Sequence, residues 1–129
     1  MRRARIRSGR LVALLGAGAA ILAAPAQAHH SSAMFDSART VTLVGTVKEL
    51  QWASPHCWLQ VLVPSDAGAL EWSVEMAAPF ELMRRGWKPV TVRPGDKVTI
   101  TAYPARDGTR GAMYVTGAGE DGRPLGQGR

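Results

Sequence analysis

The sequence predicts an all-β domain with one short helix, folded as a five-stranded OB-like barrel. Residues 29–129, which follow a leader-like start, are enough for one small domain with one core. Five segments show the β-branched content and alternation of strands, and one helical segment separates the third from the fourth. This order is typical of an OB-type barrel, whereas a β-sandwich would need about seven strands.

The first 28 residues have the three parts of a secretory signal peptide. Five arginines precede an uncharged apolar stretch over residues 11–24, and Ala26-Gln27-Ala28 then gives the small-x-small pattern of a cleavage site. The apolar stretch is shorter than the roughly 20 residues of a membrane-spanning helix. We therefore predict that residues 1–28 are removed on export to the periplasm and that no membrane span remains.

Export also changes the charge of the chain. Five of the 16 Lys and Arg residues lie in residues 1–28, so 11 basic and 10 acidic residues remain, a net charge of +1. Because binding to nucleic acid depends on a basic groove, we predict no nucleic-acid partner. Cys57 is the only cysteine, and we expect it to be buried because it opens an apolar strand pattern.

The strands follow one another along residues 41–118, which we predict to form the barrel domain. Residues 29–40 have no clear period and are interpreted as an N-terminal arm. The first strand covers residues 40–52, with Gly45 marking a bulge or a bend. The second covers residues 57–63, with Cys57, Leu59, Val61 and Val63 facing inward and Trp58 in solvent. The third covers residues 69–76.

The helix is predicted over residues 79–85. Pro79 suits its first turn, Gly86 suits the position just past its end, and Trp87 can fold back on the last turn as the apolar contact of a glycine cap. A turn and a fourth strand follow over residues 93–103, and the fifth strand covers residues 112–119. Residues 119–129 are predicted to form a C-terminal tail that frays.

The sequence is poor in enzyme motifs, and we predict a non-enzymatic protein with no catalytic residues. It has no Gly-rich phosphate loop, no Gly-x-Ser-x-Gly and no His-Glu-x-x-His. Met76, Met83 and Met113 fall on predicted elements and are expected to fill the core.

The histidines are the candidate metal ligands. Cleavage after Ala28 would give His29 a free α-amine beside its imidazole, and these two nitrogens can chelate one metal ion. His30 adds a third nitrogen, and His56, in the turn after the first strand, offers an opposing one. Such a set favours Cu(II), and the thioether of Met34 suits Cu(I). In the alternative interpretation, His29 and His30 are polar residues of a terminus and His56 hydrogen-bonds a turn.

Several stretches together resemble a known family of small exported bacterial proteins without an assigned function. They are "AHHSSAMFD", "GTVKELQWASPHCWLQV", "EWSVEMAAPFELMRRGW" and "PGDKVTITAYPARDGTRGA", and the likeness covers residues 28–124. Family members typically open with Ala-His-His-Ser-Phe and carry Trp-x-Asn-Pro-His, and this chain departs from that pattern at Ser32 and Ser54. The resemblance implies a periplasmic location and a small β-barrel. It singles out the matching residues His29, His30, Met34, Phe35, Trp52, Pro55, His56, Gly86 and Trp87.

Our leading hypothesis is a periplasmic domain that binds copper through its new amino terminus. The arrangement of ligands is similar to the amino-terminal histidine sites of lytic polysaccharide monooxygenases and periplasmic copper carriers, as an analogy without a sequence match. A second hypothesis is a metal-free interaction or accessory module, which docks its arm or an exposed tryptophan face on a periplasmic protein partner. A third is an oxidative copper enzyme.

Overall fold

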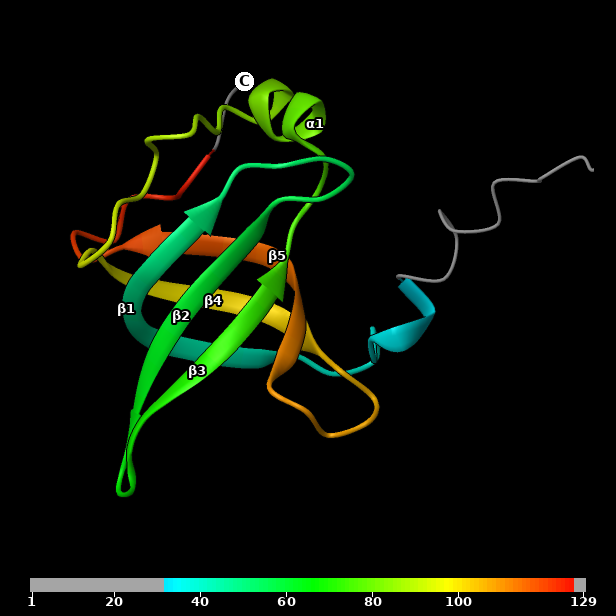
Figure 1. Cartoon of the computed structure of the whole chain (residues 1–129), viewed down its shortest axis with the longest axis vertical. Coiled ribbons are helices and arrows are strands. Elements are labelled where there is room, and N and C mark those ends of the chain that lie inside the picture. The colour runs from blue at the N-terminus through cyan, green and yellow to red at the C-terminus, as the bar shows by residue number, and fades with distance from the viewer. Residues whose placement is uncertain (1–31, 127–129) are drawn as a thin grey trace, which may run out of the picture.

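The computed structural model describes residues 32–126 of the chain. Within them, one short 3-10 helix, five strands and one α-helix follow in sequence, as Figure 1 shows. They are η1 (Ser32–Met34), β1 (Val41–Gln51), β2 (Trp58–Ser65), β3 (Gly68–Glu75), α1 (Pro79–Arg84), β4 (Lys97–Pro104) and β5 (Gly111–Gly119). The predicted order of three strands, one helix and two strands is confirmed.

The strands close into a barrel in the order β1-β2-β3-β5-β4, with β4 pairing back onto β1. All neighbouring strands are antiparallel except β3 and β5, which run parallel over three residue pairs from Ser73–Gly111 to Glu75–Met113. Helix α1 lies over one end of the barrel (Figure 1). This five-stranded barrel, with its helix between the third and fourth strands, has the OB-type architecture that the sequence predicted.

Strand β1 is long because it belongs to both sides of the barrel. Its first half pairs with β4 up to Thr46, and its second half pairs with β2 from Thr46 onward. Gly45 lies where the two pairings meet, and a β-carbon added to it would overlap the carbonyl oxygen of Leu62. The predicted bend at Gly45 therefore corresponds to a close backbone approach, whereas the bulge lies farther on, between Val47 and Glu49.

The core fills the barrel with the inward-facing side chains of all five strands. On β2, Leu59 and Val61 are buried as predicted, and so is Cys57 just before the strand. Val63 is only half-buried, because the β2–β3 hairpin extends past the end of the barrel (Figure 1). Trp58 is half-buried, so the prediction that it lies in solvent is wrong. Trp58 is paired on both sides, with Gln51 of β1 and with Glu75 of β3.

Helix α1 ends at Arg84, one residue earlier than predicted. The glycine cap at Gly86 is the one that the sequence predicted. Gly86 has a φ of 81° and donates its N–H to the carbonyl of Met83 at 3.0 Å. The N–H of Trp87 donates to the carbonyl of Leu82 at 2.9 Å, and the side chains of Trp87 and Leu82 are both buried in the core. These two bonds and this apolar contact make a Schellman motif, which orients the indole into the barrel.

Residues 123–126, here called the C-terminal strap, return across the barrel instead of fraying. Gly119 donates its N–H to the carbonyl of Arg123 at 2.9 Å, and Leu125 donates to Gly117 at 2.8 Å. Gly126 lies against Trp87 so closely that a β-carbon on it would overlap the indole ring. The predicted fraying is therefore wrong for this part of the tail, because backbone bonds and the Trp87 contact hold it.

Candidate functional site

The loop between β1 and β2, residues 52–57, carries His56 to the end of β3. The peptide bond between Ser54 and Pro55 in this loop is cis. Cys57 donates its N–H to the carbonyl of Ala77 at 3.2 Å, and Met76 donates its N–H to the carbonyl of Cys57 at 2.9 Å. These bonds tie the end of the loop to the segment that follows β3, and they bring His56 beside Glu75.

His56 and Glu75 form a close pair with the carboxylate on the inside. Nδ1 of His56 lies 2.5 Å from Oε1 of Glu75, and 9% of the Glu75 side chain is exposed against 35% of His56. Burial of a carboxylate is unfavourable unless charge-assisted hydrogen bonds compensate for it, which the imidazole does here. Because Nδ1 donates to Glu75, Nε2 is the ring nitrogen left to bind a ligand.

The pair borders a pocket of about 370 Å³ at this end of the barrel. Residues from η1, the β1–β2 loop, the ends of β3 and α1, and β5 contribute to its wall. They are Ser32, His56, Glu75, Met76, Ala77, Arg85, Met113 and Tyr114. The pocket is therefore built from segments that lie far apart in the sequence.

Strand β5 supplies two different side chains to this pocket. Met113 is the parallel-strand partner of Glu75, so the two residues lie on the same face of the sheet, and it is half-buried. Tyr114 packs edge-on against Trp87, with 5.6 Å between the ring centroids and an angle of 87° between the planes. Burial raises the pKa of Tyr114 to about 12, so its hydroxyl stays protonated at neutral pH.

The remaining polar groups near the pocket are engaged elsewhere or are unreactive. Arg85 pairs with Glu81 at 3.3 Å on the exposed side of α1. Cys57 is buried as the sequence predicted, and burial raises the pKa of its thiol. This thiol lies 3.7 Å from the carbonyl oxygen of Ala53. Cys57 is therefore a packed core residue rather than a thiolate ligand.

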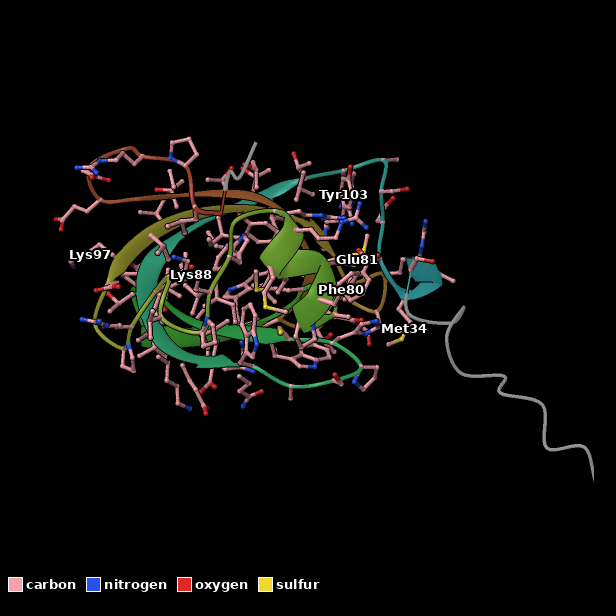
Figure 2. The ribbon with its side chains drawn as sticks, turned by 90° about the horizontal axis from the view of Figure 1, so that it is seen from above. Met34, Phe80, Glu81, Lys88, Lys97 and Tyr103 are labelled. Carbon is pink, nitrogen blue, oxygen red and sulfur yellow. The ribbon has the colours of Figure 1, made fainter. Side chains whose placement is uncertain are left out.

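The candidate ligands of the sequence are partly within the structure. His29 and His30 lie outside the described residues. Met34 belongs to η1 and is 58% exposed, and Figure 2 shows it at the edge of the molecule. Its carbonyl accepts the N–H of Arg106 at 2.9 Å, which anchors the arm to the end of β4. Two residues before it, Ser32 lines the pocket of His56.

The other residues singled out by the resemblance have mainly structural places. Phe35 is buried and forms a β-bridge with Ala105. Trp52 is half-buried against the core, Pro55 is exposed in the loop, and Trp87 is buried. Of these, Pro55 adjoins His56 in the sequence, and Trp87 supports the pocket through Tyr114.

Sequence reasoning missed Glu75, Met113 and Tyr114 as pocket residues. The alternation of the third strand puts Glu75 on the face opposite Val74, which is ordinarily the outer face of a barrel. Its burial depends on the β1–β2 loop and β5, so no local signal marks it. Met113 could have been noticed only with the β3–β5 register in hand.

Residues 32–126 lack both a preformed metal cluster and a membrane-spanning helix. These residues contain no group of three or more His, Cys, Asp or Glu side chains placed to hold a metal ion. No helix within the same residues is long and apolar enough to span a membrane.

Comparison with known proteins gives a family and a set of distant structural neighbours. A family model described as "Family of unknown function (DUF6152)" matches residues 18–114. The mitochondrial single-stranded DNA binding protein Rim1 from S. cerevisiae is similar in its crystal form 2, with 14% sequence identity and a TM-score of 0.47 over 70% of this chain and 96% of that one. Its form 1 gives 13% identity and a TM-score of 0.47 over 70% and 97%. No curated protein matches the chain.

Proposed function

This chain belongs to the DUF6152 family of unknown function, and we propose that it is a periplasmic copper-binding domain without catalytic activity of its own. In this proposal, residues 1–28 are removed on export and His29 becomes the first residue. The observation that carries the proposal is the His56–Glu75 pair, which borders a pocket that Ser32 also lines.

The His56–Glu75 pair has the form that metal-binding histidines usually take. Such histidines commonly donate their second ring nitrogen to a carboxylate, which fixes the tautomer and makes the ligating nitrogen more basic. Glu75 occupies Nδ1 of His56 in this way and leaves Nε2 for the ion. This support is independent of the terminal histidines.

The chain length between Ser32 and His29 allows the terminal histidines to reach the same pocket. Three residues span at most about 11 Å when fully extended, and Ser32 already lines the pocket. In this proposal, the α-amine and imidazole of His29, with His30 beside them, bind the same ion as Nε2 of His56. Together they would make a nitrogen-rich set, which favours Cu(II) among the divalent metals.

The test is a Cu(II) titration of protein whose amino terminus has been verified by intact mass as His29. Two variants are compared with it: a chain with one extra residue before His29, and His56→Ala. The extension keeps every imidazole but moves the amine away from the chelate. We expect each variant to lose affinity about tenfold or more, as is usual when a ligand or its support is removed.

The outcomes separate a built site from a trivial one. If both variants bind Cu(II) as tightly as the parent, the proposal is wrong. If only the extension weakens binding, the site is a local chelate that any chain starting with His-His would form, and the role of His56 is wrong. Periplasmic protein that begins at His29 supports the export step, whereas a chain in the membrane fraction that still carries residues 11–24 contradicts it.

A second candidate function, a metal-free interaction module, is supported by the outer face of α1. Phe80 is 66% exposed, and Met83 on the same helix is exposed as well. Figure 2 shows Phe80 beside helix α1, and the guanidinium of Arg84 lies 5.9 Å from its ring centroid. An apolar surface of this kind fits a protein partner. In this case Phe80→Ser would abolish partner binding, and the titration would show no binding of Cu(II).

A further inference from the structure

We propose that Met113 supplies a thioether ligand through which the His56 pocket also holds Cu(I). This inference rests on the proposed function, because it assigns a second ligand type to the same site. The pocket would then bind a second kind of ion, a soft monovalent cation. The inference concerns binding only, and the ion is supplied in its reduced form.

The strand register places Met113 beside the His56–Glu75 pair. Met113 and Glu75 are the last residue pair of the parallel β3–β5 ladder, and both line the pocket. The carboxylate of Glu75 contacts Nδ1 of His56 at 2.5 Å. His56 and Met113 therefore line one pocket. Glu75 links them, because it is the strand partner of Met113 and its carboxylate contacts His56.

The other described methionines are placed differently. Met76 also lines the pocket, but it is 3% exposed and belongs to the hydrophobic core. Met34 is largely exposed in η1, outside the lining of the pocket, and Met83 is exposed on α1. Met113 alone among them combines a place in the pocket wall with partial exposure.

The side chains of the wall also suit a soft monovalent ion. Thioether sulfur is a soft, uncharged donor that selects Cu(I), and imidazole binds copper in either oxidation state. Glu75 is the one buried charged residue among the described residues, so a monovalent ion beside it gives a neutral pair.

The experiment measures Cu(I) and Cu(II) affinities separately on protein that begins at His29. Cu(I) is titrated without oxygen against a competing Cu(I) chelator, and Ag(I) serves as a redox-inert probe. Met113→Leu is compared with Met34→Leu and Met83→Leu, because Leu conserves the volume of Met and lacks only the donor. We expect Met113→Leu to weaken Cu(I) binding about tenfold or more and to leave Cu(II) binding nearly unchanged, while the two controls bind as the parent does.

A second measurement needs no variant. In the unaltered chain, Ag(I) should shift the NMR signal of the Met113 methyl group and leave that of Met83 in place. The inference is overturned if the Met113 methyl does not respond, or if Met34→Leu rather than Met113→Leu carries the loss of Cu(I) affinity. Cu(II) binding that depends on His56, with Cu(I) binding that ignores Met113, removes this inference alone. Failure to bind either ion removes the proposed function as well.

Discussion

His56 in the β1–β2 loop holds the carboxylate of Glu75 at the end of β3, with 2.5 Å between Nδ1 and Oε1. The contact joins a loop to the point where β3 meets β5. Glu75 is the more buried partner, so the imidazole is positioned by a strand side chain that is largely shielded from solvent. The orientation of His56 is therefore a property of the fold.

Replacing Glu75 with Gln should weaken Cu(II) binding about 10- to 100-fold, the usual effect of losing a carboxylate behind a ligating histidine. Glutamine keeps the shape of the side chain but removes the charge that fixes the tautomer of His56. Glu81→Gln is the matched control, because Glu81 pairs with Arg85 on the exposed side of the helix. Equal affinities for Glu75→Gln and the parent in a competition titration would contradict this prediction.

Replacing Gly126 with Ala should destabilise the domain by about 1–3 kcal/mol more than replacing Gly122, the range typical of overpacking. Both glycines have positive φ values, 66° and 75°, so both variants carry similar backbone strain. A β-carbon on Gly126 overlaps Trp87, whereas one on Gly122 meets nothing within 4 Å. Urea unfolding measures the difference, and a red shift of tryptophan fluorescence should accompany it. Equal losses in the two variants would show that the strap does not pack on Trp87.

The stability of the domain should fall as the pH rises from about 10 to about 12, partly because of Tyr114. Burial raises the pKa of Tyr114 to about 12, so the folded state keeps a phenolic proton that the unfolded state loses near pH 10. This contribution is complete below pH 10 and disappears as the pH approaches 12. Urea unfolding at several alkaline pH values should show a steeper fall for the parent than for Tyr114→Phe. Parallel pH profiles for the two proteins would refute the assignment.

The elements of this fold could be predicted because their signals are local. Strand alternation needs only neighbouring residues, and Pro79 and Gly86 mark the ends of the helix within a few positions. Even the place of Trp87 follows from the glycine cap. Gly45 stood out for the same reason, as a glycine inside a strand pattern that predicts a bulge or a bend, and the structure shows a close backbone approach there.

The pocket could not be predicted because its residues meet only through distant pairings. The alternation of β3 assigns Glu75 to the outer face, and its burial comes from His56 and from β5. Met113 is an ordinary strand methionine until the β3–β5 register places it beside Glu75. The C-terminal strap was missed in a related way, because its Gly-rich sequence resembles a free tail and its packing depends on the flat face of Trp87.

The ladder between β3 and β5 is the shortest in the barrel, with three residue pairs. Its last pair, Glu75 and Met113, also borders the pocket. An ion bound to Met113 and to the His56–Glu75 pair would link β3 to β5 across this short ladder. Ion binding would then oppose the separation of β3 from β5, because a ligand that binds only the closed barrel stabilises that form. A partner protein that separates β3 from β5 would therefore also release the ion.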